Sequence, residues 1–260
     1  MTDDLWVQRR VNDLKIGLVF LTRLPLTHQL PIAKGQLSQA LWVAPIVGIA
    51  VGLLGAGVYG LAQTLNVPPL PAATLAVAAT VLVTGGLHED GLADVADGFG
   101  GGATRQRKLE IMRDSRIGTY GVCALILSFM LRVAVLTNLE ETAAVAAALV
   151  AAHAAARAPL AAFMRLVPTV RPDGMSADAG RPPQASAVVA ILLGAVSLGF
   201  GLGFAAGVVA IVLLCATFGF MAWLCLRQVG GQTGDVLGAL EQIGEIAVML
   251  VAAAAWNTLR

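Results

Sequence analysis

Residues 88–97 contain most of the side chains that could carry out chemistry. The run His88-Glu-Asp-Gly-Leu-Ala-Asp-Val-Ala-Asp97 follows directly on an apolar stretch. On a helix, the side chains of Asp90, Asp94 and Asp97 would project within an arc of about 60°. Three carboxylates this close repel one another unless a cation neutralises them. Oxygen ligands favour Mg²⁺, with Mn²⁺ as the alternative, and bound Mg²⁺ often also takes phosphate oxygens from a substrate. We therefore predict that these three aspartates are catalytic and bind a metal ion.

The two residues before Asp90 have different predicted roles. A helical His88 would point about 160° away from the aspartates, so we expect it at the start of the helix. There it would contact substrate or act as an acid or base. Glu89 points about 100° off the same face and is a weaker candidate. The alternative for the whole group is a solvated helix start stabilised by acidic residues, which explains one or two acids but not three on one face.

The segment that follows is rich in glycine and then in basic residues. Glycines at 98, 100, 101 and 102 predict the end of the helix and either a close approach of backbone to a ligand or a plain turn. On a second helix, Arg105, Lys108, Met112 and Arg116 would share one face. A basic stripe beside a metal site suits a polyphosphate, although membrane topology or anionic lipid would also require positive charge here. The predicted substrate-binding residues of this segment are Arg105, Lys108, Arg113, Asp114 and Arg116.

Further charged residues lie in or beside apolar runs near the end of the chain. Asp235 lies in a glycine-rich turn, and Glu241 and Glu245 follow four residues apart in an apolar run. Charge is unfavourable there unless it has a function. We predict that these three acids form a second cation-binding element; the alternative is stabilisation of a helix N-terminus. Arg157, four residues after His153, is predicted to hold a second anionic group of the substrate.

Membrane-spanning helices must position these residues. Hydrophobic residues make up 57% of the 260 residues and charged residues only 13%, against roughly 25% charged in a soluble domain. This composition excludes an ordinary cytosolic enzyme and indicates an integral membrane protein. We predict one all-α, polytopic, membrane-embedded catalytic domain over residues 1–260. About seven apolar runs are long enough to span: Leu41–Ala62, Leu70–Leu87, Thr119–Leu136, Ala143–Met164, Ala187–Ala205, Gly207–Leu226 and Ile243–Leu259.

The N-terminal segment Trp6–Pro25 is predicted to be an interfacial or re-entrant helix. Its apolar stretch, Ile16–Leu21, is too short to cross about 30 Å of hydrocarbon. The alternative is an ordinary first span in which the Arg23 side chain reaches the membrane surface.

The distribution of basic residues predicts the orientation in the membrane. Lys and Arg lie before the first predicted span and in alternate connections, whereas Gln63–Pro69 and Asn138–Thr142 contain none. The positive-inside rule then puts the N-terminus and the basic loops in the cytoplasm. We expect a bacterial inner-membrane protein with a cytoplasmic active face, with the lipid bilayer as a partner and no nucleic acid.

Three motifs can be recognised in the chain: a specific central motif, His88-x-Asp90-Gly-x-x-Asp94-x-x-Asp97-Gly followed by Ile111-Met-Arg-Asp114-Ser-Arg-Ile-Gly118-x-Tyr120-Gly121, and two signatures, Phe20-Leu-Thr-Arg23-Leu-Pro25 and Gly230-Gly-Gln-Thr-Gly-Asp235-Val-Leu-Gly238. Through these motifs the chain resembles the cobalamin synthase family over essentially its whole length. One departure is Glu89, where the family pattern leads us to expect an apolar residue.

The resemblance implies a reaction. Family members are adenosylcobinamide-GDP ribazoletransferases, which perform the last assembly step of the cobamide nucleotide loop. The ribose hydroxyl of α-ribazole, or of its 5′-phosphate, attacks the phosphorus on the cobinamide arm, and GMP leaves. Mg²⁺ on Asp90, Asp94 and Asp97 would then bridge the diphosphate, and His88 or a nearby acid would take the hydroxyl proton. A second copy of the chain or other corrinoid-pathway enzymes are further expected partners.

Two other function classes remain open from the sequence. CDP-alcohol phosphotransferases share Asp94-Val-Ala-Asp97-Gly98, but the residues that follow differ. A cation or metabolite transporter would also carry acids within broken helices. A transporter would need these acids near the middle of the membrane, whereas Asp90–Asp97 is predicted at its cytoplasmic end.

Overall fold

The structure, a computed structural model, describes residues 2–25, 35–171 and 174–259. Within these ranges the regular elements are helices, and one isolated bridge joins Thr169 to Gln232. In chain order the helices are α1 (Thr2–Leu21), α2 (Gln36–Ala40), the 3₁₀ helix η1 (Leu41–Val43), α3 (Ala44–Thr64), α4 (Pro69–Thr84), α5 (Leu87–Gly101), α6 (Arg105–Ile111), α7 (Thr119–Leu139), α8 (Thr142–Arg157), α9 (Leu160–Leu166), α10 (Met175–Ala179), α11 (Gln184–Gln228) and α12 (Gly234–Leu259).

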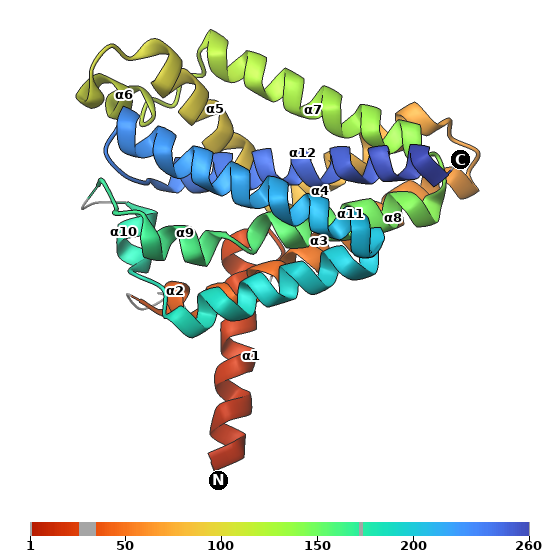
Figure 1. The fold of residues 1–260 in the computed structure, drawn as a ribbon, viewed down its shortest axis with the longest axis horizontal. Coiled ribbons are helices and arrows are strands. Elements are labelled where there is room, and N and C mark those ends of the chain that lie inside the picture. The colour runs from red at the N-terminus through yellow and green to blue at the C-terminus, as the bar shows by residue number, and fades with distance from the viewer. Residues whose placement is uncertain (1, 26–34, 172–173, 260) are drawn as a thin grey trace.

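The apolar helices form the predicted polytopic bundle, but the separate helices that could span a membrane are fewer than the predicted spans. Within the described ranges, five helical stretches are long and apolar enough to cross a membrane, and the pair α4–α5, bent by 90°, makes a sixth. The fifth and sixth predicted spans both lie in the 45-residue α11, whose helical geometry breaks at Gly203 (φ 77°, ψ 173°). The two arms of α11 fold back on each other at this glycine (Figure 1), which is the tight pair that the uncharged sequence predicts.

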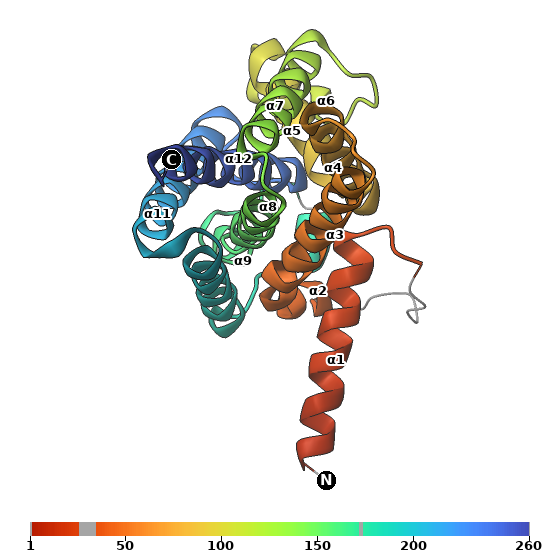
Figure 2. The same ribbon diagram turned by 90° about the vertical axis from the view of Figure 1, so that its right-hand side faces the viewer.

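Helix α1 does not join the bundle as a span. It stands across the long helices and projects away from them (Figures 1 and 2), and it is not among the helices apolar enough to cross a membrane. The side chains of Leu5, Trp6 and Val7 are each more than half exposed. A helix with this direction and composition opposes the alternative of an ordinary first span, and the interfacial or re-entrant position of the segment stays a prediction.

Small residues let the central helices approach closely. A Cβ at Gly48 of α3 would lie 2.2 Å from the carbonyl oxygen of His153, and one at Gly52 would lie 2.7 Å from the Cα of Val150. Both partners are on α8, so α3 and α8 cross in direct backbone contact. This is the small-residue packing typical of membrane helices, which lack a hydrophobic driving force between them.

A pair of glycines makes the bend that begins α5. Gly85 and Gly86 both have a φ of 68°, a left-handed conformation that residues with a Cβ rarely adopt. The Arg23 side chain packs on Gly85, where an added Cβ would lie 2.4 Å from its Nε. The backbone N–H of Arg23 also donates to the carbonyl of Val83 at 2.6 Å. The end of the N-terminal helix is therefore fastened to the turn that orients α5.

The loops and short helices that connect the long helices lie at the two ends of the bundle. Helices α5, α6 and α10 and the loop before α12 lie at one end, and the C-terminus lies at the other with the α7–α8 connection (Figure 1). The predicted basic loops thus share one end. Which side of the membrane this end faces stays a prediction.

Candidate active site

The crossing of α5 and α12 brings two distant sequence motifs together. A Cβ at Gly91 would lie 2.7 Å from the carbonyl oxygen of Asp235, and one at Gly238 would lie 3.2 Å from the Cα of Gly91. Side chains at either glycine would hold the helices apart. Because both positions are glycine, the first turn of α12 lies directly against α5, with Asp235 beside Asp90 and Asp94.

Asp90, Asp94 and Asp235 form a group of anions with little compensating charge. Asp90 is exposed, and Asp94 and Asp235 are half-buried. Within the described residues, the carboxylates of Asp90 and Asp94 have no hydrogen-bond or ion-pair partner. Helix α5, with four acidic residues, is not by itself among the five helical stretches apolar enough to cross a membrane. Burial, and then the charges of Asp235 and Asp90, raise the pKa of Asp94 to about 7. Repulsion of this kind is relieved when a cation binds.

Asp97 has a different environment from the other two motif aspartates. Its carboxylate is buried and accepts the backbone N–H of Gly118 at 2.7 Å and of Gly121 at 2.9 Å. These groups belong to the first turn of α7, whose N–H groups have no partner within the helix. A Cβ at either glycine would lie within 2.5 Å of an Asp97 oxygen. Asp97 therefore caps α7 from another helix, and the predicted role in metal binding stays a prediction.

Asp97→Ala is expected to destabilise the protein by about 1–3 kcal/mol, because two buried N–H groups lose a charged acceptor. Asp97→Asn, which keeps one acceptor oxygen, should recover part of the loss. Thermal unfolding in detergent measures both. The matched comparison is Asp94→Asn, which removes a repelled charge and should not lower the midpoint. Equal destabilisation by Asp94→Asn and Asp97→Ala would contradict the capping role.

Arg171 is a site residue that the sequence did not single out. Its Nη1 lies 3.3 Å from Oδ2 of Asp235, and its Nη2 donates to the carbonyl of Leu109 at 2.8 Å. The loop that carries it is held by paired backbone contacts with Gln232, at 2.8 and 3.1 Å. Arg171 thus joins α6 to the turn before α12. The polar, turn-rich composition of its loop was the only sequence signal.

A cavity opens where these elements meet. His88, Asp90 and Gly91 of α5 line it on one side, and Asp235 and Gly238 of α12 line it on another. The remaining walls are mostly apolar side chains contributed by the first helices and α9, among them Phe20, Leu21, Leu37, Leu41, Leu160 and Met164. The cavity therefore combines carboxylates, one imidazole and an apolar surface.

A network of buried ion pairs lies beside the cavity. Arg132 of α7 is 3.1 Å from both Glu89 and Glu245, and the Nη1 of Arg157 is 2.6 Å from Glu241. Arg132 lies inside the predicted span Thr119–Leu136, and the structure pairs it with acids inside the bundle. Buried charges need such partners, because each unpaired charge costs several kcal/mol.

Glu241 and Glu245 therefore have basic partners. Together with His153 they are the one trio among the described residues whose ligand-type atoms all lie within 4.8 Å of one another. The guanidinium groups of Arg132 and Arg157 already balance the negative charge of these two glutamates, which is an alternative to the predicted metal ion. Asp235 is separate from them and belongs to the cavity. Metal binding by Glu241 and Glu245 stays a prediction.

His88 joins the network to the cavity. It is the second residue of α5, as its predicted place at the helix start requires. Its Nδ1 lies 3.3 Å from Nη2 of Arg157 and 3.4 Å from Oε2 of Glu241. The imidazole also lines the cavity beside Asp90.

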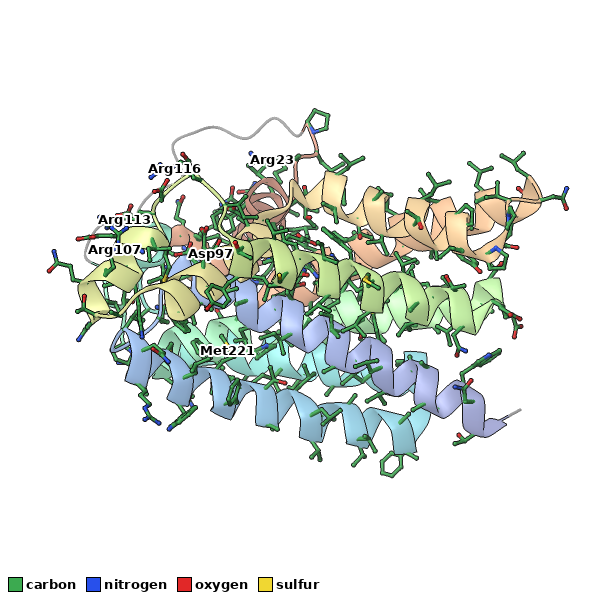
Figure 3. The ribbon with its side chains drawn as sticks, turned by 90° about the horizontal axis from the view of Figure 1, so that it is seen from above. Arg23, Asp97, Arg107, Arg113, Arg116 and Met221 are labelled. Atoms are coloured by element: carbon green, nitrogen blue, oxygen red, sulfur yellow. The ribbon has the colours of Figure 1, made fainter. Side chains whose placement is uncertain are left out.

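The basic segment does not form the predicted stripe. Helix α6 ends at Ile111, so Arg116 does not share a helical face with Arg105 and Lys108. The predicted basic stripe was therefore wrong. The helix stops at the point where the Met112 side chain packs on Gly98. Lys108 contacts Gln228, and the guanidinium of Arg105 lies against Gly230. Figure 3 shows Arg107, Arg113 and Arg116 toward this end of the molecule, on the same side as Asp97.

Arg116 and Asp114 form an exposed, two-contact ion pair. The Nε and Nη2 of Arg116 lie 3.0 and 2.7 Å from the two carboxylate oxygens. The guanidinium holds the pKa of Asp114 at about 2. Both side chains point to solvent, and their predicted contact with substrate stays a prediction.

Comparison with known proteins agrees with the motifs. The family model described as cobalamin-5-phosphate synthase matches residues 13–253. The chain belongs to this family. Three relatives carry the name adenosylcobinamide-GDP ribazoletransferase: one from Bradyrhizobium diazoefficiens is 53% identical, covering 95% of each chain, one from Mesorhizobium japonicum is 51% identical over the same shares, and one from Azorhizobium caulinodans is 44% identical over 93% of this chain and 95% of its own. No solved structure matches the chain.

The structure gives the glycines of the cobalamin-5-phosphate synthase motif two roles. Helix α5 ends at Gly101, with Gly102 as its C-cap, so the predicted end of the helix in this glycine-rich run is confirmed. A Cβ at Gly98 would lie 2.4 Å from the side chain of Met112, and one at Gly100 would lie 2.9 Å from the ring of Tyr120. These glycines let neighbouring segments of the protein, rather than a ligand, approach the helix.

Glu89, the departure from the expected family pattern, also has a structural partner. Its Oε1 accepts from Arg132 at 3.1 Å and from Gln242 at 3.3 Å. In this member of the cobalamin-5-phosphate synthase family, the acid at position 89 is therefore part of the buried network and does not face the cavity with Asp90.

Proposed function

We propose that this protein is an adenosylcobinamide-GDP ribazoletransferase. It would join adenosylcobinamide-GDP to α-ribazole, or to α-ribazole 5′-phosphate, and release GMP. The observation that carries the proposal is the meeting of the central and C-terminal motifs at one cavity, which Asp90 and Asp235 line and which has Asp94 as a charged neighbour of both. The family membership and the names of the three relatives support the same reaction.

The carboxylates of Asp90, Asp94 and Asp235 have the donor chemistry of a divalent cation site, and they would have to draw closer around the ion, because their oxygens do not all lie within 4.8 Å of one another. Their donors are all oxygens, as Mg²⁺ and Mn²⁺ prefer, and Asp94 is crowded by like charge. When bound, the ion would neutralise the diphosphate of the substrate. Asp97 remains a further candidate ligand, although both of its oxygens accept backbone N–H groups.

The other residues would bind and orient the two substrates. A groove beside the cavity is lined by Arg105, Arg113 and Arg171, and guanidinium groups bind phosphate oxygens in a fixed geometry. The ribose hydroxyl of one substrate would attack the phosphorus attached to cobinamide, the bond to the GMP oxygen would break, and the hydroxyl proton would pass to a basic atom lining the cavity. Alignment of two bound substrates supplies much of such a rate enhancement.

The location proposed for the enzyme is the bacterial inner membrane. The basic loops lie at the end of the bundle that carries α5, α6 and α10 (Figure 1), and residues of α5, α10 and the first turn of α12 line the cavity. Positive loops remain in the cytoplasm. A cysteine placed at exposed Arg107 should react with a membrane-impermeant thiol reagent in inside-out vesicles only. Labelling in right-side-out vesicles would oppose this orientation.

The reaction itself is tested with the purified full chain in detergent. Adenosylcobinamide-GDP, α-ribazole and Mg²⁺ are expected to yield GMP and a cobamide in equal amounts. Excess EDTA should abolish both products, and added Mg²⁺ or Mn²⁺ should restore them. Omitting α-ribazole is the control, and GMP release without it would indicate hydrolysis. No GMP from the complete mixture would refute the proposed function, and undiminished GMP in EDTA would refute the cation.

A further inference from the structure

We propose that His88 presents an N–H, rather than a basic lone pair, to the cavity, and that Arg157 is the positioning residue that enforces this. The inference rests on the proposed function, because it assigns roles within that reaction. His88 is then a hydrogen-bond donor to an anionic oxygen of the substrate. It is not the acceptor of the hydroxyl proton.

The contact between Arg157 and His88 determines the tautomer. The Nη2 of Arg157 lies 3.3 Å from Nδ1 of His88. A guanidinium has N–H groups only and does not lose a proton in proteins, so it can only donate. The Nδ1 atom must therefore be the acceptor. A neutral imidazole with a lone pair on Nδ1 carries its proton on Nε2.

Arg157 is held too firmly to turn away from His88. Its side chain is 1% exposed. Its Nη1 donates to the carbonyl oxygen of His153 at 2.9 Å and lies 2.6 Å from Oε1 of Glu241. Because Nη1 is occupied by these partners, Nη2 is left facing His88. Glu241 also approaches Nδ1 of His88, at 3.4 Å, but makes no hydrogen bond with it.

The opposite edge of the imidazole is the one left open toward the cavity, because Nε2 makes no hydrogen bond within the described residues and yet is not fully buried. The Nδ1 edge is turned to the buried network, and His88 lines the cavity together with Asp90 and Asp235. The Nε2–H is thus a donor among carboxylates, where it can bind a phosphate oxygen of the diphosphate. A donor fixed at such a site contributes about 10²–10³ in rate. Arg157 does not line this cavity, so it acts through His88 and not on the substrate.

Glutamine distinguishes a donor from a base at position 88. Its side-chain amide offers an N–H near the position of Nε2 but cannot take up a proton. His88→Gln is expected to keep kcat for GMP release within about tenfold of the original enzyme, whereas His88→Ala should lose about 10²–10³. Thermal unfolding checks that both variants are folded. If His88→Gln is as inactive as His88→Ala while folded, the donor role is wrong.

A double-mutant cycle tests the positioning by Arg157. Arg157→Lys keeps a positive charge for Glu241 but loses the forked contact with His88. It should lower kcat about tenfold with little change in KM, and have less than about twofold effect in the His88→Gln background, where no tautomer can change. Arg132→Lys is the matched control, equally buried and paired with two glutamates. Its effect should be the same in both backgrounds. Equal loss from Arg157→Lys in both backgrounds would overturn the positioning role.

A measurement without turnover separates this inference from the proposed function. The protein has three histidines, and the ¹⁵N resonances of His88 are those missing from His88→Gln. The Nε2 resonance should show a protonated nitrogen and the Nδ1 resonance an unprotonated one, with a mixture in Arg157→Lys. Protonation on Nδ1 in the original protein would refute the inference even if GMP is released. If the protein shows the expected tautomer but releases no GMP, the inference about His88 is supported and the proposed reaction is refuted.

Discussion

Asp94→Ala is expected to lower the rate of GMP release by about a thousandfold or more. Asp94 has both Asp90 and Asp235 as charged neighbours, so its loss would remove one ligand of the proposed cation and the charge stabilisation that the cation supplies. Excess Mg²⁺ should restore little of the activity. The control is Glu141→Ala, an exposed acid at the opposite end of the bundle, which should remain within about twofold. Retention of more than a tenth of the activity by folded Asp94→Ala would contradict this role.

The pH dependence of the cation effect gives a second readout for Asp94. Its pKa is raised from 3.8 to about 7 by burial and by neighbouring carboxylates. The folded, cation-free chain therefore binds more protons than the unfolded chain between these values. Stability that depends on this proton is lost as the pH rises toward about 7. A bound cation replaces the proton, so Mg²⁺ should raise the unfolding temperature more at about pH 8 than at about pH 6. In the Asp94→Asn variant, the rise in unfolding temperature caused by Mg²⁺ should be small at both pH values.

Arg132→Leu is expected to be the most destabilising single substitution, by about 3–5 kcal/mol. It leaves Glu89 and Glu245 buried without their shared partner, and breaking a buried pair in this way has effects of that size. Because folded proteins are stable by only about 5–15 kcal/mol, the yield of folded protein should fall sharply.

The matched control for Arg132 is Arg107→Leu, since Arg107 pairs with Glu110 in an exposed position. Surface pairs contribute about 0–1 kcal/mol. The unfolding temperatures of Arg132→Leu and Arg107→Leu, measured in the same detergent, should show a large decrease for the first and a small one for the second. Similar shifts for both would mean that the buried network does not stabilise the bundle.

The position of Asp97 shows where prediction from the helical period ends. The spacing of Asp90, Asp94 and Asp97 correctly predicts one helix with three carboxylates on a common face. It says nothing about what each carboxylate meets. Gly118, twenty-one positions further along the chain, supplies an N–H to Asp97, and only the approach of α7 to α5 determines that contact.

The sequence alone determined the membrane class, the helical architecture and the single helix that carries Asp90, Asp94 and Asp97. Each follows from local hydrophobicity or from a helical repeat, and these act over a few residues. Only the tertiary structure decided that Asp235 faces the α5 aspartates while Glu241, six residues later, pairs with Arg157. The physical reason is that partners of charged groups come from other helices. The contact of Gly91 with Gly238 fixes how α5 and α12 cross, and that crossing assigns one acid to the cavity and another to the buried network.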